Sequence, residues 1–211
     1  MKKTTLKLSF LSLIVTGLFA FAFISCGGGD KKKDKKDTTK IDTTAKKTTV
    51  KGDLASAKII VTGFMKKDAD CMALTKKLVP NLDDCKAYLA KEEDAQKVFT
   101  YMQDFVQKME KEDKPIAPKA EQDDYLIYSA TTDQMKEKEW KGDLEKFPGG
   151  YHDLAPMLKP GITIYMFRFV KKGEEKGIRY DGLIFVNDHW VIFPKIWKAF
   201  KIKEPAKTKK K

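Results

Sequence analysis

Residues 27–52 restrict where this chain can fold. They begin with three glycines and then hold nine Lys, four Asp and repeated Thr, with few apolar residues. A segment of this composition cannot bury enough apolar surface to offset the entropy lost on ordering it. We therefore predict a flexible charged tether over 26–52 and a similar disordered Lys-rich tail over 203–211. Folding is then confined to 53–202, a length that suits one domain.

The positive charge of the chain lies mainly outside that predicted domain. The whole sequence has a net charge of +12; residues 27–52 contribute +5 and 195–211 contribute +7, whereas 53–194 carries −3. A nucleic-acid-binding protein typically gathers Lys and Arg on a folded face, with Arg for bidentate contacts. Because Arg168 and Arg179 are the only arginines, we predict no nucleic-acid partner. The Lys-rich ends are either solvated or attracted to anionic lipid or acidic polysaccharide.

The first 26 residues follow the order of a secretory signal, with positive charge, then an apolar stretch, then a small residue. The apolar stretch is Leu8–Ile24, which contains no charged residue, and Ser25 and Cys26 follow it. The basic residues that precede it are Lys2, Lys3 and Lys7. The stretch is shorter than the roughly 20 residues that a membrane-spanning helix needs. We therefore favour an export signal over a permanent membrane span.

This N-terminus resembles the signal of bacterial lipoproteins. Phe23 and Ile24 stand where the usual signal has leucine and a small residue, which is similar to the relaxed signal of spirochaetes and some Bacteroidetes. The resemblance implies that residues 1–25 are removed and that Cys26 is acylated, with palmitate among its fatty acids. Two or three acyl chains would anchor the protein stably to a bacterial membrane, most naturally the outer membrane. An ordinary signal peptide cut elsewhere, or an uncleaved helix, is the alternative.

The first half of the domain is predicted to be helical. Asp53, either Asp68 or Asp70, and Asn81 can each cap a helix, and Pro80 stops the second of these helices. The clearest helix covers 92–111, because its apolar residues form a continuous stripe that should face a core. The stripe consists of Ala95, Val98, Phe99, Met102, Phe105, Val106 and Met109.

The second half of the domain is predicted to form strands. We expect strands over 125–130, 162–170, 178–186 and 190–193, the last three in an antiparallel meander. Asn187-Asp188 suits the tight turn before the last strand. The strand over 162–170 is apolar on both alternating faces, so we predict that it is covered on both sides. Residues 133–146 are highly charged and are compatible with a helix.

Helices followed by a curved meander make an α+β layout that resembles the nuclear transport factor 2-like superfamily, in which helices close a cone of bent antiparallel sheet. The hairpin 181–194 is similar to the last hairpin of that group, and 78–80 to the loop after its second helix. A cystatin-like α+β sheet is the alternative. The superfamily contains isomerases, dehydratases and binding domains, so the resemblance does not assign a function.

Enzymes of that superfamily use carboxylates and His inside the cone for proton transfer. His152 and Asp153 can lie at the mouth of such a cone, and Asp181 can point into it or pair with a Lys. Gly182 after Asp181 indicates a β-bulge. His189 lies beside the predicted turn and is expected to be solvent-exposed. The sequence contains no zinc-site spacing, nucleophile elbow or phosphate loop, and we predict no cofactor and no metal.

Four aromatic residues of the C-terminal strands are candidates for lining a ligand-binding surface, although core packing would also account for them. They are Tyr165, Phe167, Tyr180 and Trp190. Cys71 and Cys85 are the cysteines that remain after Cys26, and an even number in an exported protein favours a disulfide between them. If they begin successive helices, they are too far apart to be joined and are instead separate small buried residues.

Two classes of function follow from the sequence. The first is a non-catalytic, membrane-anchored lipoprotein that binds a protein partner or small ligand through its C-terminal sheet. The second is a proton-transfer enzyme of the isomerase or dehydratase kind that uses His152, Asp153 or Asp181 as its base. We predict the first, because no strong catalytic motif accompanies these three residues.

Overall fold

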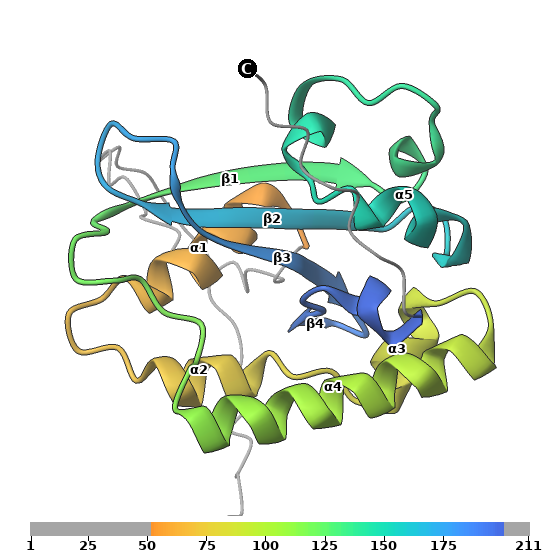
Figure 1. Ribbon diagram of the computed structural model, residues 1–211, viewed down its shortest axis with the longest axis horizontal. Coiled ribbons are helices and arrows are strands. Elements are labelled where there is room, and N and C mark those ends of the chain that lie inside the picture. The colour runs from red at the N-terminus through yellow and green to blue at the C-terminus, as the bar shows by residue number, and fades with distance from the viewer. Residues whose placement is uncertain (1–51, 201–211) are drawn as a thin grey trace, which may run out of the picture. The chain divides into compact units, whose positions relative to one another are not determined.

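The structure, a computed structural model, describes residues 52–200. The predicted signal, the predicted acylation site Cys26, the predicted tether up to residue 51 and the predicted Lys-rich tail from 203 lie outside the described residues. The described part has the predicted α+β order, with helices first and a four-stranded antiparallel sheet afterwards (Figure 1). The α-helices are α1 (Leu54–Phe64), α2 (Cys71–Lys77), α3 (Leu82–Tyr88), α4 (Glu92–Glu112) and α5 (Gly150–Leu154). The strands are β1 (Asp124–Thr131), β2 (Thr163–Val170), β3 (Gly177–Val186) and β4 (His189–Ile192).

The first three helices begin where their capping residues predict. Asp53 caps α1, and its carboxylate accepts a hydrogen bond from the backbone N–H of Ser56 at 2.9 Å. Asp70 caps α2 by accepting from the N–H of Ala73, also at 2.9 Å. Asn81 caps α3. Each capping side chain accepts a hydrogen bond from a backbone N–H that has no acceptor inside its own helix. The three predicted helix starts are therefore confirmed.

The strands follow one another in the order β1-β2-β3-β4, each antiparallel to the next, which confirms the predicted meander. Opposite Met166, β3 holds two residues, Asp181 and Gly182, where a regular ladder has one. Gly182 has a φ of +82°, so the predicted bulge is confirmed. Asn187 and Asp188 have φ of +49° and +62°, as a two-residue hairpin turn requires.

The sheet is buried on both faces, and each face has its own apolar core. The first core joins one face to α3, α4 and α5, and the second core joins the other face to α1 and α2. Along β2, Ile164 and Met166 belong to the first core, whereas Tyr165, Phe167 and Phe169 belong to the second. The prediction that this strand is covered on both sides is confirmed.

The charged segment 133–146 does not form an α-helix. It contains two short 3-10 turns, η1 (Gln134–Lys136) and η2 (Gly142–Lys146), and it buries only Met135 and Leu144 within those turns. Two isolated apolar residues do not make the stripe that would hold a helix against a core. Gly142, with a φ of +62°, also interrupts a right-handed helix at the start of η2.

The predicted disulfide between Cys71 and Cys85 is absent, and both residues are free thiols. Cys85 lies in the first core, whereas Cys71 packs against the second core on the other face of the sheet. The two cysteines are held apart because they lie on different helices, and these helices cover opposite faces of the sheet. Burial raises the pKa of the Cys85 thiol to about 12, with a further contribution from the charge of Asp84.

The bulge at Gly182 gives a direct test of the sheet geometry. A Cβ atom at residue 182 would lie 2.3 Å from the carbonyl oxygen of Phe193, whereas a Cβ at Gly173, which has the same φ of +82°, would meet nothing within 4 Å. Gly173→Ala should lower the free energy of unfolding by about 1–2 kcal/mol, the cost of a left-handed backbone. Gly182→Ala should lower it by about 3–4 kcal/mol, because the backbone clash is added.

Urea denaturation of the two variants and the parent measures both losses. Equal losses at the two positions would contradict the close approach of β3 to the chain after β4.

Candidate functional site

Asp181 is the predicted catalytic residue that the structure places inside the domain. Its side chain is 1% exposed, and one carboxylate oxygen accepts a hydrogen bond from the backbone N–H of Lys195 at 3.0 Å. Lys195 has a φ of +54°, a conformation that is unfavourable for a residue with a side chain. The hydrogen bond therefore stabilises the turn that leads into η4 (Ile196–Phe200), from which Trp197 enters the first core.

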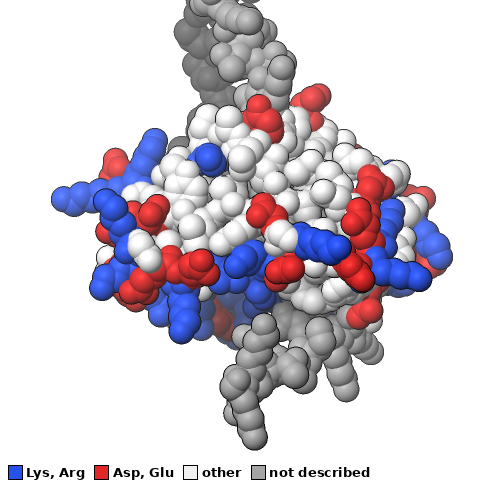
Figure 2. All heavy atoms as spheres, turned by 90° about the horizontal axis from the view of Figure 1, so that it is seen from above, with Lys and Arg blue, Asp and Glu red and all other residues white. Residues whose placement is uncertain are grey.

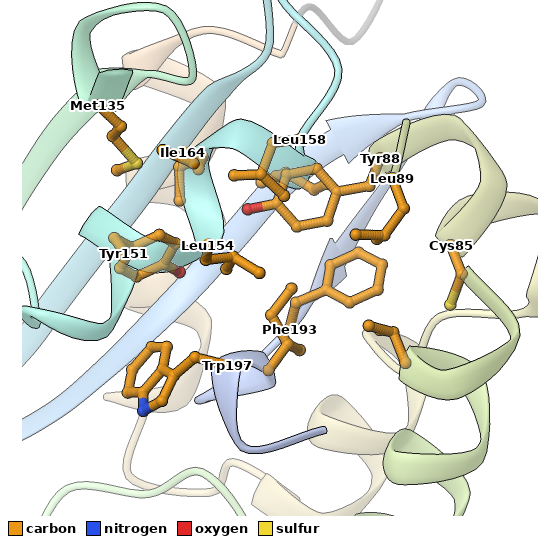
Figure 3. Packing of buried hydrophobic residues seen from close by; sticks show 14 of the residues in the cluster. Cys85, Tyr88, Leu89, Met135, Tyr151, Leu154, Leu158, Ile164, Phe193 and Trp197 are labelled. Carbon is orange, nitrogen blue, oxygen red and sulfur yellow. The ribbon is translucent and has the colours of Figure 1, made fainter. Parts of the chain in front are cut away.

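Two tyrosine hydroxyls lie in the same core as this carboxylate. Tyr88 from α3 and Tyr151 from α5 are fully buried, and Figure 3 shows their hydroxyl groups pointing toward each other. Neither hydroxyl meets the geometry of a hydrogen bond to another group of the described chain. Burial raises the pKa of both phenols well above the ordinary value of 10, and the charge of Asp181 raises them further. Both groups are therefore neutral hydrogen-bond donors at physiological pH.

In such a group the carboxylate can accept a proton, and the two neutral phenols can donate hydrogen bonds. Packed side chains of the first core surround the rings of Tyr88 and Tyr151 (Figure 3). The neighbours in the first core that are no more than 1% exposed include Met102, Leu154, Leu158 and Phe193. Aliphatic and aromatic packing of this kind favours a structural role for Asp181, which holds the turn before Trp197.

The other two predicted catalytic residues are not brought to Asp181. His152 and Asp153 are exposed, because the residues on either side of them in α5, Tyr151 and Leu154, occupy the first core. The ring of His152 stacks on Trp140, with centroids 3.6 Å apart and an angle of 16° between the planes. His152 and Asp153, the candidates for the mouth of a cone, are thus exposed side chains of α5, and they stay separate candidates from the buried Asp181.

A histidine–aspartate pair that the sequence did not predict joins α3 to the β3–β4 turn. His189 Nε2 lies 3.2 Å from Oδ2 of Asp84, whose side chain is completely buried. The same carboxylate accepts hydrogen bonds from the N–H of Asn81 and from the side-chain amide of Asn187, each at 2.9 Å. The other ring nitrogen of His189 lies 3.0 Å from the carbonyl oxygen of Asn187. His189 was expected to be exposed, and its side chain is 43% exposed.

The Asp84 pair is built as a structural clamp. Three donors converge on one buried carboxylate, which satisfies a charge that would otherwise be costly to bury. The position of Asp84 in the first turn of α3 is a local feature, whereas His189 lies 105 residues away in the sequence. A histidine beside a turn, such as His189, does not by itself indicate a carboxylate partner elsewhere in the chain.

The four aromatic residues predicted to line a binding surface do lie together, on the second-core face of the sheet. They are Tyr165, Phe167, Tyr180 and Trp190. The rings of Tyr165 and Trp190 have centroids 5.6 Å apart, and those of Phe167 and Tyr180 are 5.5 Å apart. The Tyr165 hydroxyl donates to the carbonyl oxygen of Gly52 at 3.2 Å. Because α1 and α2 cover this face, these rings form core rather than an open binding surface.

Acidic and basic side chains are mixed on the surface. Figure 2 shows them interleaved around the rim of one face, with a broad uncharged area between them. Several form ion pairs, such as Lys76 with Glu110 at 2.7 Å and Lys86 with Glu92 at 2.6 Å. These pairs are solvent-exposed and contribute little to stability.

Within residues 52–200, no group of three His, Cys, Asp or Glu side chains is arranged to hold a metal ion. Among the helices of the same region, none is long and apolar enough to cross a membrane. Comparison of the chain with protein-family models, with curated proteins and with solved structures finds no match.

The clamp on Asp84 predicts a large difference between two neighbouring substitutions. Asp84→Asn should lower the free energy of unfolding by about 2–3 kcal/mol, because an amide cannot accept from all three donors. Asp83→Asn, at the neighbouring exposed position of the same helix, should change it by less than about 0.5 kcal/mol. Thermal and urea unfolding of both variants measure these values, and equal effects would show that Asp84 is not the clamp.

Proposed function

We propose that this chain is an exported bacterial lipoprotein, anchored to a membrane through acylated Cys26, whose domain is a non-catalytic binding module. The observation that carries the non-catalytic role is the environment of Asp181. This carboxylate is buried among packed side chains and engaged by a backbone N–H, while His152 and Asp153 are exposed elsewhere. The charge–apolar–small order that ends at Cys26 supports export and acylation.

The boundary between tether and domain also supports this arrangement. Gly52, the first described residue, is held on the domain because its carbonyl oxygen accepts from Tyr165 and its Cα packs on Phe185. A Cβ at residue 52 would lie 2.4 Å from the Cβ of Phe185, so a side chain there would displace the ring. We therefore place the start of the domain at the end of the Lys-rich composition, as a tethered display module requires.

We further propose that the domain has a nuclear transport factor 2-like architecture, with the outer membrane as its site of anchoring. Support comes from the element order, from the bulge at Gly182 that bends β3, and from the helices that close the first-core face. Partners consistent with the Lys-rich ends are anionic lipids or acidic polysaccharide, and a protein partner would bind the exposed surface of the domain.

One observation favours a second function. The hydroxyls of Tyr88 and Tyr151 are buried donors that face each other without a well-formed hydrogen bond within residues 52–200, and Asp181 is in the same core. A small substrate with a carbonyl oxygen would satisfy those donors, with Asp181 as the base of a proton-transfer reaction. This second function requires a motion that opens the first core.

Metabolic labelling with a palmitate analogue tests the lipoprotein proposal. Label should be incorporated into the parent chain and lost in Cys26→Ala, because the acylated thiol is removed. Cys71→Ala is the matched control, since it removes another thiol and should leave the label unchanged. Equal label in the parent and in Cys26→Ala would refute acylation at that residue, as would loss of label in the control.

A further inference from the structure

Strand β1 forms one edge of the four-stranded sheet, so one side of its backbone has no strand of the described chain beside it (Figure 1). Successive amides of an antiparallel strand point alternately toward the neighbouring strand and away from it. The amide of Thr132 extends the ladder with β2, because it donates to the carbonyl oxygen of Ile162 at 2.9 Å. Every second residue before Thr132 therefore also faces β2. The outward amides are those of Tyr125, Ile127, Ser129 and Thr131.

The outer edge of β1 lacks the features that usually prevent a strand from pairing with another chain. β1 pairs with β2 over eight residues without a bulge, it contains neither Lys nor Pro, and residues 125–131 are uncharged. Figure 2 looks down on the side where Figure 1 places β1, and it shows a broad area without charged side chains. A long and regular edge strand of this kind is a template on which another strand can add.

The segment 133–146, termed the edge guard below, lies against the C-terminal half of this edge and supplies acceptors for two of its amides. Oδ2 of Asp143 accepts from the N–H of Ser129 at 3.2 Å. Oε1 of Gln134 accepts from the N–H of Thr131 at 2.8 Å, and the backbone N–H of Gln134 donates to the Thr131 hydroxyl at 3.1 Å. The two side-chain oxygens take the places that carbonyl oxygens of a neighbouring strand would occupy.

The edge guard is attached to the domain at both of its 3-10 turns. Met135 in η1 and Leu144 in η2 are buried in the first core. Between them, Trp140 stacks on His152 of α5, and its indole N–H donates to the carbonyl oxygen of Met135 at 3.3 Å. In Figure 1 this part of the chain lies above the C-terminal end of β1. Its position beside the strand is therefore fixed by packing on the first core.

The middle of β1 is the part of the edge that the guard does not cap. The outward amide of Tyr125 is satisfied by the side chain of its own neighbour, because it donates to Oδ1 of Asp124 at 2.8 Å. For the outward amide of Ile127, no acceptor is found within residues 52–200. An extended strand laid along this edge would supply a carbonyl oxygen for it.

We infer that β1 is a self-pairing edge, which binds β1 of a second copy of this chain when the edge guard is displaced. In an antiparallel pair with Ile127 opposite its own counterpart, each open amide donates to the other Ile127 carbonyl oxygen. Tyr125 of each copy then lies opposite Ser129 of the other, so the pairing has the two-fold symmetry of a homodimer. Residues 125–129 are uncharged, so like charges do not oppose each other in this pairing.

The edge guard and the second copy exclude each other. Asp143 contacts the N–H of Ser129, the position at which Tyr125 of the second copy would pair. A charged segment that covers an edge strand is one of the ways in which proteins avoid edge-to-edge association. The edge guard therefore acts as an internal inhibitor of dimerisation, which gives the otherwise irregular segment 133–146 a role.

Analytical ultracentrifugation of the chain purified in detergent, combined with amide hydrogen exchange, tests this inference. Gln134→Ala combined with Asp143→Ala removes both acceptors of the guard, and both side chains are exposed, so the two cores stay intact. Glu139→Ala is the matched control in the same segment, because its carboxylate pairs with the exposed Lys141. The parent and the control should sediment as monomers.

In the dilute double variant, the amides of Ser129 and Thr131 should exchange about tenfold faster than in the parent, or more, because each loses its acceptor. At higher concentration the double variant should form dimers in which the amide of Ile127 is protected. Adding Leu126→Lys should abolish these dimers, because a lysine on an edge strand opposes pairing. Leu126 is partly exposed and lies outside the two cores, so this change leaves the fold intact.

Three results would overturn the inference. Unchanged exchange of Ser129 and Thr131 in the double variant would show that the edge guard does not cap β1. A double variant that stays monomeric at every concentration would show that β1 does not bind a second copy. Dimers that persist with Leu126→Lys, or that leave the amide of Ile127 unprotected, would place the association on another surface of the chain.

Discussion

Burial of the sheet on both faces is the constraint on which the rest of this structure depends. Along β2, Ile164 and Met166 enter one core while Phe167 and Phe169 enter the other. A shift of one residue in register would exchange the two sets of side chains between differently shaped cores. Helices must therefore cover both faces, which explains why α1 and α2 separate from α3 and α4 although the four are consecutive in the chain.

The same double burial limits what the interior can do. Asp181 lies where the bulge of β3 meets the first core, and its hydrogen bond to Lys195 places Trp197 in that core. Burying the Asp181 carboxylate costs solvation free energy. The hydrogen bond from the backbone N–H of Lys195 and the packing that it supports offset this cost. This packed interior is the feature that supports the proposed binding module.

Local signals in the sequence predicted most of the fold, and distant contacts account for what was missed. Asp53, Asp70 and Asn81 each accept from a donor three residues away, so the helix starts were predictable. The pairing of Asp84 with His189 and the separation of Cys71 from the first core depend on tertiary packing, which leaves no local pattern. Acylation at Cys26 stays a prediction, since that residue lies outside the described region.

Native-state hydrogen exchange of the mature chain in detergent tests the central claim, that β2 joins both cores into one cooperative unit. The amides of Met166 and Phe167 should exchange only through global unfolding, with a free energy equal to that from urea denaturation. The amide of Ile127 on the edge strand β1 should exchange through smaller openings. Exchange of the β2 amides at a free energy clearly below the global value, while α4 remains protected, would contradict the account.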